Sequence, residues 1–215
     1  MKLHLILFTS MIIIAIACKS DTVQDQPMKR TIDIFKEYIT GDFTNANQIT
    51  HQRESGLITH PFAVHINRVA NDKIINAPAV DGFWVLEESY YTWEGKETEL
   101  KPYLFLFEAI GDTAVRLTPF LWPEDLYEVE VVKNDNPDLV FDYRDLKASP
   151  TFSPADYRFN GEVFTIFAPN DLGNGLRFTL IETLYPDRLE VMELLEKDSQ
   201  RLTPYDSPIL YERVE

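Results

Sequence analysis

The spacing of apolar residues changes along the chain and predicts three kinds of segment. Residues 3–17 are almost wholly apolar. Residues 31–40 carry large apolar side chains at helical spacing and end before Gly41, which predicts a short amphipathic helix. From Phe62 onward, short runs rich in Val, Ile, Phe, Tyr and Thr alternate with clusters of turn residues, which is typical of β-strands.

The strand-like part of the chain predicts a closed sheet. Its segments lie at 62–69, 83–93, 102–110, 114–120, 126–133, 157–167, 176–184, 188–195 and 209–214. The connections are short and contain no interleaved helices, so we expect an antiparallel meander. A long meander tends to close because closure removes exposed strand edges. The predicted fold class is mainly β: an antiparallel up-and-down β-barrel, a lipocalin-like calyx, with a short N-terminal helix.

Two of the predicted strands, 83–93 and 102–110, carry large apolar side chains on both faces. A sheet with one side in water would alternate apolar and polar residues instead. We therefore expect either a helix packed outside these strands or a partner protein on the barrel exterior.

Aromatic rings on these strands are accompanied by carboxylate and phenol groups, a combination that fits a small-molecule cavity. The alternative is a filled barrel core, since aromatic strand faces commonly serve packing alone. The candidate ligand-binding residues are Tyr103, Glu87, Glu88, Phe105 and Tyr90. Strand alternation sends Glu87 and Glu88 to opposite faces, so only one can face the cavity unless a bulge intervenes. For either glutamate, an ordinary solvated side chain is the alternative.

The N-terminus has the layout of an export signal. A short basic start precedes an apolar run too short for a comfortable transmembrane helix, and small residues lead up to Cys18. Cys18 is the chain's only cysteine and stands where a bacterial lipoprotein signal places its acylated cysteine. An ordinary cleaved signal is the alternative. We expect residues 1–17 to be a signal peptide, 18–30 a flexible tether and 31–215 the barrel domain.

The charge balance narrows the partners that we expect. The chain has 20 basic and 35 acidic residues, for a net charge of −15. Such a field repels phosphate backbones and anionic headgroups, so nucleic acid is not an expected partner. A lipid on Cys18 would attach the protein to a membrane without a basic patch. The expected location is the bacterial cell envelope, as a membrane-anchored lipoprotein that faces the periplasm or the surface.

Several short segments resemble one family. The run Gly41-Asp42-Phe43-Thr44-Asn45-Ala46-Asn47-Gln48 resembles the opening of the CpcT/CpeT chromophore lyases. Trp84-Val85-Leu86-Glu87-Glu88 is similar to their aromatic-aliphatic-Glu-Gln strand, and Pro102-Tyr103-Leu104 to their Pro-Tyr-Arg step. Phe159-Asn160-Gly161 and the closing run 208–213 also resemble family segments. The similarity follows nearly the whole barrel domain in order.

The resemblance implies a calyx that holds a bilin and delivers it to a cysteine of an acceptor protein. Tyr103 would donate a hydrogen bond, and Glu87 would pair with a basic or N–H group such as a pyrrole nitrogen. Leu104 replaces the expected arginine, Glu88 replaces a glutamine, and the family's internal cysteines are absent. A propionate in a low-dielectric cavity needs a cation or several donors, so the resemblance implies the barrel more firmly than the reaction.

The expected function is therefore binding of a small hydrophobic or tetrapyrrole-like ligand, with bilin attachment by an active lyase as the alternative. No catalytic residue is assigned, and no metal or cofactor is required. Asn45 and Gln48 are expected to cap the entry from helix to strand rather than to touch ligand. A zinc site built from His51, His60 and His65 would require a loop, because a spacing of five puts the last two on opposite strand faces.

Overall fold

The computed structural model describes residues 30–123, 126 and 132–214. The predicted signal peptide, Cys18 and the tether up to residue 29 lie outside the described residues, as does most of the strand predicted at 126–133. No helix in the described part is long and apolar enough to cross a membrane.

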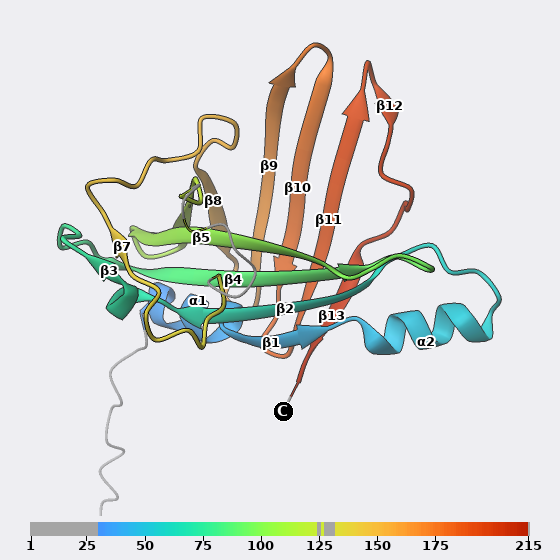
Figure 1. The fold of residues 1–215 in the computed structure, drawn as a ribbon, viewed down its shortest axis with the longest axis horizontal. Coiled ribbons are helices and arrows are strands. Elements are labelled where there is room, and N and C mark those ends of the chain that lie inside the picture. The colour runs from blue at the N-terminus through green and yellow to red at the C-terminus, as the bar shows by residue number, and fades with distance from the viewer. Residues whose placement is uncertain (1–29, 124–125, 127–131, 215) are drawn as a thin grey trace, which may run out of the picture.

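The barrel wall consists of ten strands. They are β1 (Gly41–Thr44), β2 (Phe62–Val69), β4 (Gly82–Thr92), β5 (Glu99–Ile110), β6 (Ala114–Phe120), β8 (Ala155–Phe159), β9 (Phe164–Gly173), β10 (Leu176–Leu184), β11 (Arg188–Lys197) and β13 (Ile209–Arg213). Their order around the wall is β10-β9-β8-β6-β5-β4-β2-β1-β13-β11, and pairing of β11 with β10 closes the ring. Every neighbouring pair is antiparallel. The predicted antiparallel barrel is confirmed, and Figure 1 shows β9–β11 crossing steeply behind β2, β4 and β5.

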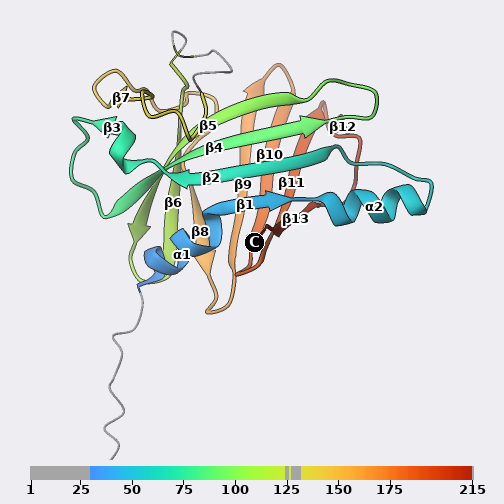
Figure 2. The same ribbon diagram turned by 60° about the horizontal axis from the view of Figure 1, so that its bottom comes forward.

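The predicted N-terminal helix is also confirmed, as α1 (Thr31–Ile39), and it fills one end of the barrel (Figure 2). Ile32, Phe35 and Ile39 form its buried face. The ring of Phe35 packs against rings of the barrel wall, with its centroid 4.9 Å from those of Phe107 on β5 and Tyr157 on β8. Burial of this apolar stripe holds α1 in place, because a helix of nine residues has little stability of its own.

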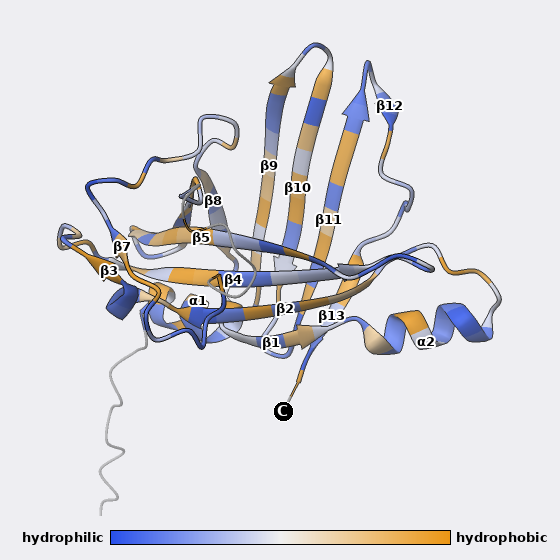
Figure 3. Ribbon diagram, in the orientation of Figure 1, coloured by the Kyte–Doolittle hydropathy of each residue, from blue (hydrophilic) through white to orange (hydrophobic). Residues whose placement is uncertain are grey.

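A second apolar core lies outside the barrel, on the outer faces of β4 and β5, where Figure 3 shows apolar residues side by side. Its inner layer includes Trp84, Leu86 and Leu104. Leu139 and Phe141 of the long β6–β8 connection cover that layer, and this connection also holds β7 (Phe141–Asp142), which pairs with β3 (Ile74–Ile75). The expectation of a covering helix or partner protein is wrong, since the chain's own connection supplies the cover.

The strand predicted at 157–167 is wrong, because the structure divides it into the hairpin of β8 and β9. The Asn160 side-chain oxygen accepts the N–H groups of Glu162 and Val163, both at 2.9 Å. Gly161 has a φ of +101°, a conformation open mainly to glycine. This side-chain turn reverses the chain within what otherwise looks like one continuous strand.

Three short elements complete the fold: α2 (Ala46–Glu54), the single-turn helix η1 (Asn71–Lys73) and β12 (Gln200–Arg201). The strand pattern did not predict α2, whose only buried residue is Ile49. It lies against β2 and β13 at the barrel end away from α1 (Figure 2).

Candidate ligand-binding cavity

The barrel contains a partly open cavity of about 270 Å³, with Ile39 of α1 among its lining residues. Its apolar lining includes Val85, Phe105, Phe107, Phe178, Leu180 and Val191. A fully filled core, the alternative to a cavity, is therefore wrong for the middle of the barrel, although α1 fills one end. The volume lies just under the range of ~300–1,000 Å³ typical of ligand pockets.

Three of the five predicted site residues line this cavity: Glu87, Tyr103 and Phe105. The rings of Tyr103 and Phe105 stack with centroids 5.7 Å apart and planes 8° from parallel. One oxygen of Glu87 accepts a hydrogen bond of 2.6 Å from the hydroxyl of Ser89. This oxygen also lies 3.7 Å from Nδ1 of His65. The inward face thus combines flat aromatic surface with an oriented carboxylate.

Glu88 and Tyr90 do not belong to this group, because alternation along β4 turns them to the barrel exterior. The Tyr90 hydroxyl donates to a carboxylate oxygen of Glu88, and the other oxygen accepts the backbone N–H of Asn134 at 2.7 Å. Glu88 is only 4% exposed, so the solvated alternative is also wrong for it. These two residues fasten the β6–β8 connection to the outside of β4, and the prediction that they line the cavity is wrong.

Leu104 also faces outward, into the second apolar core, where it is 1% exposed. An arginine at this position would not point into the cavity. The leucine at this position therefore does not change the lining of the cavity.

Five charged or titratable residues of the cavity were not among the predicted site residues: His65, Lys101, Tyr157, Glu182 and Glu193. Burial raises the pKa of Glu182 to about 8, and the charge of Glu87 contributes to the shift. Burial likewise raises the pKa of Glu193 to about 7. The sequence contained a signal for Glu182 and Glu193. Each lies two residues from a buried apolar residue of its own strand, and residues two apart share one face of a strand.

His65 links three strands through its ring. Its Nε2 lies 2.9 Å from the hydroxyl of Tyr211 and 3.2 Å from that of Tyr91. Burial lowers the pKa of His65, against the opposing effect of nearby Glu87. The imidazole is therefore neutral at pH 7, and it serves as a hydrogen-bonding partner rather than as a cation.

Asn45 and Gln48 have structural roles, as expected; Asn45 is the N-cap residue of α2, but its side chain makes no capping hydrogen bond. Asn45 is fully buried, donates to the carbonyl of Pro61 and accepts the N–H of Ala63, both at 2.8 Å. Gln48 bonds in both directions to the backbone around Leu210 of β13. Together they fix α2 and its flanking turn against two strands.

His60 and His65 have different partners in the structure. Nε2 of His60 lies 2.9 Å from the carbonyl oxygen of Ser207, while His65 faces the cavity. Among the described residues, no group of three His, Cys, Asp or Glu side chains is placed to hold a metal ion.

Comparisons with known proteins add little to this geometry. No family model matches the chain, and no curated protein matches it. Among solved structures, the selenomethionine CRL protein of Arabidopsis aligns over 85% of this chain and 97% of its own, with 10% identity and a TM-score of 0.44. A likeness this distant carries no argument about function. The resemblance to the CpcT/CpeT family stays a prediction from the residues.

Proposed function

We propose that this protein is a non-catalytic binding barrel that holds a small, largely apolar molecule in its central cavity. The observation that carries the proposal is the cavity inside the barrel, where aromatic and aliphatic side chains surround a few polar groups. Ligand sites generally combine apolar walls with a small number of placed polar groups. The inward-facing Tyr103 and Glu87 supply a hydroxyl and a carboxylate for orienting a bound molecule.

The volume of the cavity limits the ligand. At about 270 Å³ the space suits a compact molecule. A linear tetrapyrrole is larger than this and would have to leave part of its length outside the mouth of the barrel. A small hydrophobic compound therefore suits the cavity better than a fully enclosed bilin.

Native mass spectrometry of the protein purified from its cells tests the binding role. We expect a noncovalent adduct of defined mass in the wild type. Ala168→Phe places a ring in the cavity lining and should abolish the adduct, whereas Phe167→Ala changes the adjacent outward residue, which is 68% exposed, and should retain it. Circular dichroism checks that both variants are folded. An adduct that survives Ala168→Phe unchanged would place the ligand outside the cavity.

The proposed location is the cell envelope, with the barrel anchored through an acylated Cys18. This part of the proposal rests on the N-terminal sequence alone. Metabolic labelling with a radioactive fatty acid tests it, since label should appear on the wild-type chain and be absent from Cys18→Ser. Equal labelling of the wild type and of Cys18→Ser would show that Cys18 does not carry the lipid.

A bilin lyase remains the second candidate, because the two residues that the family resemblance singles out, Glu87 and Tyr103, both face the cavity. This role predicts covalent transfer of a bilin to an acceptor thiol and its loss in Tyr103→Phe. Incubation with bilin and a thiol-bearing acceptor, followed by mass spectrometry of the acceptor, separates the two functions. A binding barrel leaves the acceptor mass unchanged.

A further inference from the structure

Most of the ionisable side chains inside the barrel are acidic. Three carboxyl side chains line the cavity, Glu87, Glu182 and Glu193, each from a different strand. Lys101 contributes an ammonium group to the lining, which contains no arginine among the described residues. A bound molecule would therefore meet an acidic interior that lies behind apolar walls.

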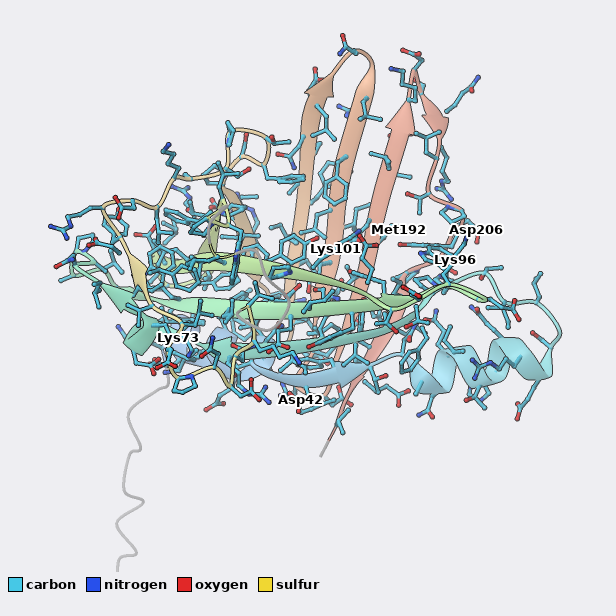
Figure 4. All side chains as sticks on the ribbon, viewed as in Figure 1. Asp42, Lys73, Lys96, Lys101, Met192 and Asp206 are labelled. Atoms are coloured by element: carbon cyan, nitrogen blue, oxygen red, sulfur yellow. The ribbon has the colours of Figure 1, made fainter. Side chains whose placement is uncertain are left out.

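Lys101 does not cancel this excess, because it already has partners of its own. Its Nζ lies 3.5 Å from a carboxylate oxygen of Glu99 and 5.6 Å from the ring centroid of Tyr91. Figure 4 shows Lys101 in the space between β5 and the steep strands β10 and β11. His65 adds no positive charge, since burial lowers its pKa.

Glu182 is the most deeply placed of the three carboxyl groups and has an unused acceptor. It is 7% exposed, and one of its oxygens accepts the hydroxyl proton of Tyr157. Within the described residues, no hydrogen bond reaches its other oxygen. Glu193 likewise receives no hydrogen bond from the described residues, and Lys101 acts on it only through space. Both carboxyl groups therefore keep an oxygen that no donor of the described residues reaches and that a bound ligand could use.

The aromatic walls suit the same type of ligand. Tyr103 and Phe105 present a stacked pair of rings along the cavity wall. The faces of such rings attract cations, and the attraction is stronger where water is excluded. A positively charged group near the carboxylates and an apolar body against the rings would satisfy both parts of the lining.

We propose that the cavity selects amphipathic cations, with a protonated amine directed at Glu182 and Glu193, over neutral or anionic molecules of the same shape. This inference rests on the proposed binding function and names its ligand class. The ammonium N–H groups would donate to the free oxygen of Glu182 and to Glu193. The apolar part would lie against the stacked rings.

Binding of a cation should depend on pH. Because burial raises the pKa of Glu182 to about 8 and that of Glu193 to about 7, the empty cavity holds protons on these groups near neutral pH. An ammonium ion binds better to the ionised carboxylates, so its binding should strengthen as pH rises and should release protons.

Four tyrosines near these carboxylates keep their protons over this range. Burial raises the pKa of four nearby tyrosines, so that their phenols remain protonated; these are Tyr91, Tyr157, Tyr205 and Tyr211. Tyr103 also lines the cavity as a titratable group. The pH response is therefore expected to come from the glutamates.

The test uses three probes of matched shape: phenylbutylamine, phenylbutanol and phenylbutyrate. Each is titrated by isothermal calorimetry into the protein, purified as the cell makes it, at about pH 6 and about pH 8.5. At the higher pH the amine should bind at least about tenfold more tightly than the alcohol, and the alcohol more tightly than the carboxylate. At the lower pH the advantage of the amine over the alcohol should shrink by about tenfold.

Variants locate the effect. Glu182→Gln and Glu193→Gln should each reduce the amine's advantage by about tenfold, while binding of the alcohol shows that the cavity is intact. Glu196→Gln, on the outer face of the same strand as Glu193, removes the same charge and should keep the advantage.

The outcomes separate this inference from the proposed function. If the alcohol binds and the amine binds no more tightly, selection of cations is overturned while the binding barrel stands. An equal loss in Glu196→Gln would also overturn it, because the effect would then be one of net charge. If none of the three probes binds, both the inference and the proposed binding function fail.

Discussion

Removal of the Phe35 ring should destabilise the barrel more than the change of any exposed aromatic side chain. Phe35 is completely buried, and its ring centroid lies 4.9 Å from those of Phe107 and Tyr157 and 5.0 Å from that of Phe164. Phe35→Ala removes these contacts at the point where α1 joins three strands of the wall. Replacement of a buried phenylalanine by alanine costs about 3–5 kcal/mol, a large share of the stability of a single domain.

Urea unfolding followed by circular dichroism measures this loss as a change in the free energy of unfolding. Phe167→Ala is the matched control, because it removes the same ring from a position that is 68% exposed and should cost at most about 0.5 kcal/mol. A loss below about 1 kcal/mol in Phe35→Ala, or equal losses in the two variants, would show that α1 is not part of the barrel core.

Three further substitutions test other parts of the structure by urea unfolding. Asn45→Ala leaves a buried N–H and a buried carbonyl without partners and should cost about 2 kcal/mol or more of unfolding free energy. Asn47→Ala, at an exposed position of α2, should cost under about 1 kcal/mol. Similar losses in the two variants would contradict the structural role of the Asn45 hydrogen bonds. Leu104→Arg buries a charge in the outer core and should cost about 3 kcal/mol or more of unfolding free energy. Leu202→Arg should be tolerated, because the Leu202 side chain is 52% exposed. Tolerance of both changes would contradict the burial of Leu104 in the outer core. In the folded protein Glu182 keeps its proton up to about pH 8, whereas in the unfolded chain it loses the proton near pH 4.5. The free energy of unfolding should therefore fall as pH rises between these values. The slope from this group should be up to about 1.4 kcal/mol per pH unit. Glu182→Gln should reduce that slope, and an unchanged slope would assign it to other groups.

The barrel itself could be predicted from the sequence because strand periodicity is local. Alternation also assigned faces correctly within β4 and β5, which is why Glu87, Tyr103 and Phe105 lie together in the cavity. The same rule already placed Glu88 on the opposite face. Its inclusion among the site residues, with Tyr90, followed from the family resemblance and from aromatic content rather than from geometry.

What could not be predicted depends on contacts between distant parts of the chain. Glu182 and Glu193 face Glu87 only because β10 and β11 close the ring on the far side of the barrel. The apolar outer face of β4 has a local signal, but its cover by Leu139 and Phe141 requires the path of a long connection. Patterns within single strands do not contain this information.

The proposed function requires a central cavity that binds ligand, and methyl NMR during titration with phenylbutanol can detect this binding. Methyl groups of Leu180 and Val191, which line the cavity, should shift and saturate together. Those of Leu86 and Leu104, in the outer core, should stay in place. Saturating shifts confined to the outer core, or no shift at either set, would contradict ligand binding in the central cavity.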